Sequence, residues 1–135
     1  MVSLAVVCVI GFGFYAANLG KLGELSGERV FYLDSASSQG LRKEELSLLD
    51  IFRVEGECVR FDRMTEEEED LVLRIQELYD AETLFTEEVD GVTSYYCFVD
   101  GWENAIELSG LKVNLHIAVS KEVCTVGTPI IFDGF

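Results

Sequence analysis

The chain has 135 residues, and 25 Asp and Glu residues against 10 Lys and Arg residues give it a formal net charge of −15. This length is enough for one domain and not for two. Nucleic-acid binding needs clustered Lys and Arg to neutralise phosphates, so the charge argues against a nucleic-acid partner. An anionic lipid surface is disfavoured for the same reason, except next to a tether that holds the chain at a membrane.

The first 20 residues contain no charged side chain, and the apolar run VSLAVVCVIGFGF at residues 2–14 continues to Leu19. About 20 helical residues span about 30 Å, the thickness of the hydrocarbon core of a bilayer. Soluble helices normally carry a polar stripe, which this segment lacks. We therefore predict a transmembrane helix or signal anchor at residues 1–20, rather than a buried element of a soluble core.

A cleaved signal peptide fits this segment less well. Such a peptide begins with basic residues and ends at a small-x-small site, and neither feature is present. Cys8 follows Val7, whereas a lipoprotein cysteine is expected to follow a small residue. We predict an uncleaved anchor, whose orientation is not fixed by its thin basic flank.

Residues 19–27, LGKLGELSG, contain three glycines, and we predict a linker at residues 21–28 that leads into a domain at residues 29–135. The sequence RVFYL at residues 29–33 predicts a strand, and residues 35–40 form a polar break. We expect a short helix at residues 41–49. Apolar and charged residues alternate over residues 52–61, with a change of phase at Gly56 that predicts a strand containing a bulge.

The clearest helix begins after Thr65. Thr65 and Glu68 have the spacing of a capping box, and the acidic residues 66–70 place negative charge at the positive end of the helix dipole. This local role explains the acidic run better than a metal site does. The apolar face is predicted from helical spacing to consist of Leu71, Val72, Ile75, Leu78 and Tyr79.

The rest of the chain reads as strands. Residues 83–89 and 92–99 flank Asp90-Gly91, the sequence signature of a type I′ hairpin turn. Asp100-Gly101 leads into residues 102–108, and two further strands are expected at residues 111–119 and 122–131. The predicted fold class is α+β, with an antiparallel meander packed on the helix and one or more earlier strands joining the sheet.

Cys8 lies in the apolar N-terminal segment, which leaves Cys58, Cys97 and Cys124 for the domain. An odd number does not make a disulfide framework, although one bridge with one free thiol and three buried thiols both remain open. The spacings match no zinc pattern. We predict that Cys97 and Cys124 are buried in the sheet and are not bridged to each other.

Three blocks of the second half resemble the YwmB family of Gram-positive bacteria, whose members are described as TATA-box binding-like. The blocks are Trp102-Glu103, KVNLHIAV at residues 112–119 and TVGTPII at residues 125–131, and the resemblance extends over residues 65–135. It implies a TBP-like α+β fold and an exported or membrane-attached protein without an established activity. The family name reflects likeness of fold and not DNA binding.

The resemblance also implies a role in the cell envelope or in sporulation. We therefore expect a single-pass protein of the cell membrane with its domain on the extracytoplasmic side. An envelope protein or a glycan is the candidate partner.

The single histidine, His116, would be needed for any Ser-His-Asp or Cys-His arrangement, and no nucleophile signature accompanies it. A zinc site would have to gather His116, Cys97 and Cys124 from different strands. We predict no metal, no cofactor and no catalytic residue.

A ligand-binding surface is predicted from the alternation of side chains along residues 111–119. If Leu115 and Ile117 face the helix, Asn114 and His116 lie on the opposite face, which an antiparallel sheet can leave in water. The predicted ligand-binding residues are Tyr95, Trp102, Asn114 and His116, with a neutral or cationic ligand favoured by the acidic surroundings. The main hypothesis is a tethered binding or structural module. The alternative is an envelope hydrolase, which a cleft and a nucleophile beside His116 would favour.

Overall fold

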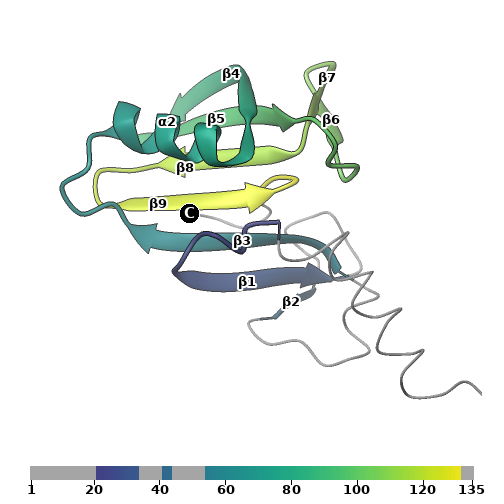
Figure 1. Ribbon diagram of the computed structural model, residues 1–135, viewed down its shortest axis with the longest axis horizontal. Coiled ribbons are helices and arrows are strands. Elements are labelled where there is room, and N and C mark those ends of the chain that lie inside the picture. The colour runs from purple at the N-terminus through teal and green to yellow at the C-terminus, as the bar shows by residue number, and fades with distance from the viewer. Residues whose placement is uncertain (1–20, 34–40, 44–53, 132–135) are drawn as a thin grey trace, which may run out of the picture.

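The structure, a computed structural model, describes residues 21–33, 41–43 and 54–131. Helix α2 packs on one face of an antiparallel sheet with the strand order β2-β1-β3-β9-β8-β5-β4, and a two-stranded β6–β7 hairpin lies at one end (Figure 1). The predicted α+β class is confirmed. The transmembrane helix predicted at residues 1–20 falls outside the described residues, within which no helix is long and apolar enough to cross a membrane.

The elements, in chain order, are β1 (Glu28–Leu33), β2 (Leu41–Lys43), β3 (Val54–Asp62), α2 (Glu68–Tyr79), β4 (Ala81–Val89), β5 (Val92–Val99), β6 (Ile106–Leu108), β7 (Leu111–Val113), β8 (Leu115–Val119) and β9 (Val123–Thr128).

Strands β4, β5, β8 and β9 form the expected meander. Asp90 and Gly91 both have positive φ, 52° and 80°, as the predicted type I′ turn requires. Strand β9 then pairs with β3, from Glu57 opposite Thr128 to Asp62 opposite Val123, and this pairing joins the two halves of the chain. The register of β1 against β3 shifts beside Gly56, where the change of phase predicted a bulge.

Helix α2 covers the sheet with Leu71, Val72, Ile75 and Tyr79, whereas Leu78 is 45% exposed and lies outside the buried stripe. The capping box predicted at Thr65 is wrong, because the N-cap is Glu67 and its side chain makes no capping bond. The carboxylate of Glu68 instead accepts a hydrogen bond from the Tyr95 hydroxyl at 2.5 Å. The predicted acidic first turn is present.

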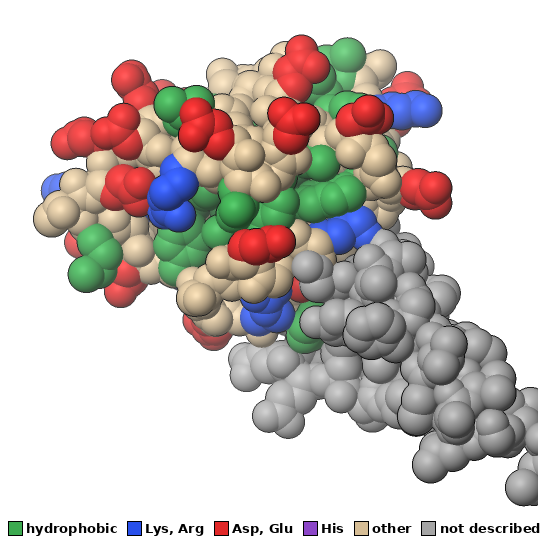
Figure 2. Space-filling view, in the orientation of Figure 1, with side chains coloured by type: hydrophobic (Ala, Val, Ile, Leu, Met, Phe, Trp, Pro, Cys, Tyr) green, Lys and Arg blue, Asp and Glu red, His purple; other side chains and the backbone are tan. Residues whose placement is uncertain are grey.

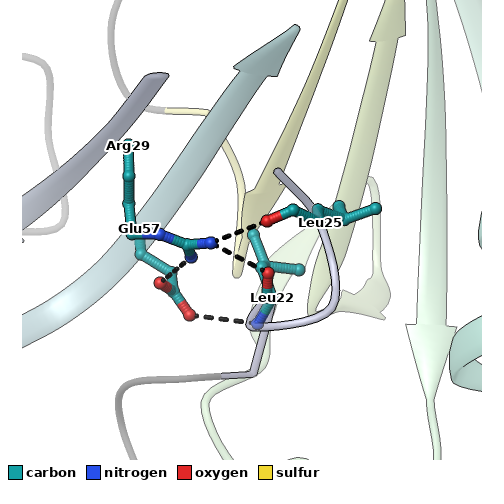
Figure 3. A network of polar contacts seen from close by, with 4 residues as sticks. All are labelled: Leu22, Leu25, Arg29 and Glu57. Atoms are coloured by element: carbon teal, nitrogen blue, oxygen red, sulfur yellow. Dashed lines mark hydrogen bonds and ion pairs between the residues drawn. The ribbon is translucent and has the colours of Figure 1, made fainter. Parts of the chain in front are cut away.

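A linker was expected at residues 21–28, but residues 21–27 begin with a turn and pack on the helix-bearing face of the sheet. Leu22 and Leu25 are 0% and 6% exposed and join the core beneath α2. Arg29 and Glu57 hold this turn in place (Figure 3). The Arg29 guanidinium contacts the Glu57 carboxylate at 2.9 Å and donates to the carbonyls of Leu22 and Leu25, while the Leu22 amide donates to Glu57.

Four other predicted boundaries were also wrong. Residues 41–43 form strand β2 and not the start of a helix, and only residues 106–108 of the strand expected at 102–108 are extended. The strand expected at residues 111–119 is divided at Asn114. Strand β9 ends at Thr128 because the chain then folds back, so that Ile130 and Ile131 lie against Gly127.

Candidate functional site

The structure does not bring the four predicted ligand-binding residues together. Tyr95 and Trp102 pack against the core beneath α2, where Trp102 meets the ring of Tyr79 edge-on at 5.3 Å. His116 lies on the opposite face of the sheet and is 3% exposed, and Asn114 is 0% exposed. The expectation that Asn114 and His116 lie on a face left in water is therefore wrong, although the Asn114 side chain does lie beside the Trp102 backbone.

Asn114 has a structural role at the break between β7 and β8. Its side-chain oxygen accepts a hydrogen bond from the Val99 amide at 2.7 Å, and its side-chain nitrogen donates to the carbonyls of Val99 and Trp102. These bonds replace the strand pairing that is lost where the ladder is interrupted. The sequence pattern did not reveal this role, because alternation alone places Asn114 on a regular strand.

His116 is the last ring of a stack that crosses three strands. Phe85, Tyr96 and His116 have ring centroids 4.6 Å and 4.5 Å apart and nearly parallel planes. The imidazole Nε2 lies 2.9 Å from the Ser94 hydroxyl, and Nδ1 accepts a hydrogen bond from the Ile131 amide at 3.2 Å. Burial lowers the pKa of His116 to about 4, so the ring is neutral at neutral pH.

Ser94 thus supplies the nucleophile whose presence beside His116 would favour a hydrolase. The Ile131 amide can only donate, so Nδ1 must be the acceptor and the proton of the neutral ring sits on Nε2. Nε2–H then donates to Ser94, whereas a general base has to accept the proton of the nucleophile. Ser94 is also only 4% exposed. In this arrangement the pair cannot activate Ser94 for attack on a substrate.

The two predicted buried thiols lie on the helix side of the sheet. Cys97 pairs with Leu115 and Cys124 with Val119, both residues of the core beneath α2, while His116 points to the other face. Cys97 and Cys124 are 0% exposed and unbridged, as predicted. Burial raises the pKa of both thiols, that of Cys124 to about 12. Because His116 faces away, these three side chains cannot share a metal ion.

The face opposite α2 carries a cavity of about 440 Å³ at the end of the sheet where the β4–β5 and β8–β9 turns lie. Its floor consists of Ala118 on β8 and Thr125 on β9, which are direct partners across the two strands. Arg60 on β3 is the partner of Thr125 on its other side. Ala118 follows His116 by two residues, so both side chains point to the same face. The predicted face therefore holds a hollow, although none of the four predicted residues lines it.

The charged side chains around this cavity are Arg60, Asp90, Lys121 and Glu122. All four are exposed, and within the described part of the chain none of their side chains makes a hydrogen bond or an ion pair. Sequence reasoning missed these residues because they lie on three separate segments. The one signal available was that Asp90 lies in a predicted turn and that Lys121 lies between two predicted strands.

A second, smaller hollow of about 260 Å³ lies on the helix side, between α2 and residues 21–27. It is lined by Glu24, Leu25, Ser26, Phe61 and Arg74. Figure 2 shows apolar side chains between the helix and this segment, bordered by both acidic and basic groups. Burial and the nearby Glu24 carboxylate raise the pKa of Tyr79 at this position. Of the residues that line this hollow, Leu25 belongs to the core and Phe61 packs against it. We regard the larger cavity on the opposite face as the better candidate site.

No protein-family model, no curated protein and no solved structure matches this chain.

Proposed function

We propose that this protein is a binding module tethered to the cell membrane, with its domain on the extracytoplasmic side and without catalytic activity. The observation that carries the proposal is the cavity opposite α2, whose charged side chains are not committed to one another. Concave sites with a few convergent polar groups are typical of ligand binding.

The membrane tether rests on the uncharged apolar segment at residues 1–20. If that segment spans the bilayer, the domain stands directly at the membrane surface, because Leu22 already belongs to the core and Arg29 and Glu57 fix the turn that follows the segment. The extracytoplasmic side rests on the resemblance to the YwmB family. The same resemblance supports the proposal that the protein belongs to that family, has its TBP-like fold and acts in the cell envelope or in sporulation.

Binding is favoured over catalysis by the state of the one histidine. His116 is buried and donates to Ser94, so it does not activate that hydroxyl as the hydrolase alternative would require. The acidic surface in Figure 2 supports a partner other than nucleic acid, since phosphates would be repelled. An envelope protein or an envelope glycan fragment is the proposed partner.

Two measurements test this proposal. Fractionation of the tagged full chain should place it in the membrane pellet after a carbonate wash, and a soluble, shortened chain would contradict the tether. Pull-down from solubilised envelope should then recover a component with the wild-type chain and with Arg74→Gln, whose site is on the helix side, but not with Arg60→Gln. Equal recovery by all three chains would contradict binding at the cavity.

A further inference from the structure

The cavity opposite α2 presents charges of both signs on different sides. Arg60 on β3 and Asp90 in the β4–β5 turn are separated by the widths of β9 and β8, because the strand order here is β3-β9-β8-β5. Three spacings of neighbouring strands amount to about 14 Å between the backbones that carry them. Both residues line the cavity, on either side of the small floor of Ala118 and Thr125. Lys121 and Glu122 add one charge of each sign from the β8–β9 turn.

This composition disfavours several classes of ligand. An anion would meet two carboxylates in a protein of net charge −15, and a simple cation would meet two basic groups. Of the two proposed envelope partners, a peptide fits this lining better than a sugar ring, because the lining contains no aromatic side chain on which a sugar could stack. An apolar ligand would have to strip water from four charged groups without replacing their hydrogen bonds. A ligand with one positive and one negative end satisfies both signs at once.

Building on the binding function proposed above, we propose that the cavity binds a small zwitterion of the size of an amino acid or a dipeptide. The carboxylate lies on Arg60, whose guanidinium can bind it through two parallel hydrogen bonds, and the ammonium group lies on Asp90. The hydroxyl of Thr125 on the floor offers a further hydrogen bond between the two ends. A cavity of about 440 Å³ accommodates a dipeptide together with some water.

The experiment is a titration of the isotope-labelled full chain in detergent micelles, followed by amide chemical shifts. The probes are L-Ala-L-Ala, its N-acetyl form, which lacks the ammonium group, and its C-terminal amide, which lacks the carboxylate. We expect L-Ala-L-Ala to shift the amides of Asp90, Gly91, Lys121 and Glu122, and to bind about tenfold more tightly than either blocked form.

Two variants assign the ends of the ligand. Arg60→Gln should lower the affinity for L-Ala-L-Ala to that of the amide form and leave the amide form unaffected. Asp90→Asn should lower the affinity for L-Ala-L-Ala to that of the N-acetyl form and leave the N-acetyl form unaffected. Asn suits the positive φ of this turn position, so the hairpin is retained. Arg74→Gln, on the helix side, is the matched control and should bind as the wild type does.

The zwitterion proposal is overturned if the blocked forms bind as tightly as L-Ala-L-Ala, if Arg60→Gln has no effect on its affinity, or if no shift appears up to about 10 mM peptide. Its failure can be separated from that of the proposed binding function. If the dipeptides cause no shifts but the envelope pull-down still depends on Arg60, the ligand class alone is rejected. If neither the shifts nor the pull-down are seen, the binding module is rejected as well.

Discussion

The buried ion pair between Arg29 and Glu57 should contribute strongly to stability, because it attaches residues 21–25 to the sheet. Replacing Arg29 by Ala leaves the Glu57 carboxylate, which is 0% exposed, with the Leu22 amide as its one remaining hydrogen-bond donor among the described residues. It also removes the donor of two hydrogen bonds to the carbonyls of Leu22 and Leu25. The turn would then lose the contacts that hold it against the core.

The size of this effect follows from the burial of the carboxylate. Two unit charges about 4 Å apart interact by about 4 kcal/mol at the effective dielectric constant of about 20 that suits proteins. Removing one partner of a buried pair typically costs about 3–5 kcal/mol, since the other charge stays buried without compensation. Arg29 is 26% exposed, so water can partly replace it, and we expect a loss of about 3 kcal/mol in the free energy of unfolding.

Urea unfolding of the full chain in detergent, followed by the fluorescence of Trp102, measures this loss without screening the charges. The matched control is Arg74→Ala, which removes an ion pair with Glu66 whose side chains are 53% and 33% exposed. Such an exposed pair contributes less than about 1 kcal/mol. Arg29→Met combined with Glu57→Leu should recover part of the loss, because it leaves no unpaired charge. The reasoning is refuted if Arg29→Ala costs no more than the control, or if the double variant recovers nothing.

Four further predictions follow from other parts of the structure. Because the pKa of His116 is lowered to about 4 in the folded chain, the unfolded chain takes up a proton at a higher pH than the folded chain does. The free energy of unfolding should therefore fall as the pH drops from about 6.5 towards 4, by about 3 kcal/mol in all. Thermal unfolding in the window from about pH 6.5 to 5 should show this slope in the wild type and not in His116→Asn. Gly127→Ala places a Cβ 2.7 Å from the Ile131 side chain, and should destabilise the protein by about 1–3 kcal/mol and speed hydrogen exchange at the Ile131 amide; unchanged exchange would contradict this packing. Cys97 and Cys124 should resist a thiol reagent until the chain unfolds and should then both titrate as free thiols, so that a stoichiometric bridge would count against the buried pair. In a gel-shift series at about 50 mM salt, duplex DNA should not be bound, and a tight, salt-sensitive complex would show that the charge argument is wrong.

Much of the fold was accessible from short stretches of sequence. The Asp90-Gly91 turn, the acidic start of α2 and the alternation that directs Leu115 and Ile117 towards the helix depend on residues that are neighbours in the chain. Backbone preferences and side-chain periodicity therefore predicted them correctly. The charge-free segment at residues 1–20 and the net charge of −15 are likewise properties of the sequence alone, and the membrane anchor that the segment predicts is still to be tested.

The candidate site shows where this reasoning stops. Alternation gave the correct face of β8 for His116, but it could not show that Ile131 folds back to bond the ring. Glycine content suggested a linker at residues 21–28. Leu22 and Leu25 are nevertheless buried, because Arg29 and the distant Glu57 together bind the turn.

The cavity depends on tertiary structure even more strongly. Arg60, Asp90 and Thr125 meet at one hollow only because β9 pairs with β3 in a particular register, and a shift of one residue would turn Arg60 to the other face. Composition and periodicity determined the class of fold and its elements, since these arise from local backbone preference and from the need to bury one apolar face. The pairing of distant strands decided which charged side chains share a cavity, because that pairing is set by the packing of the whole core.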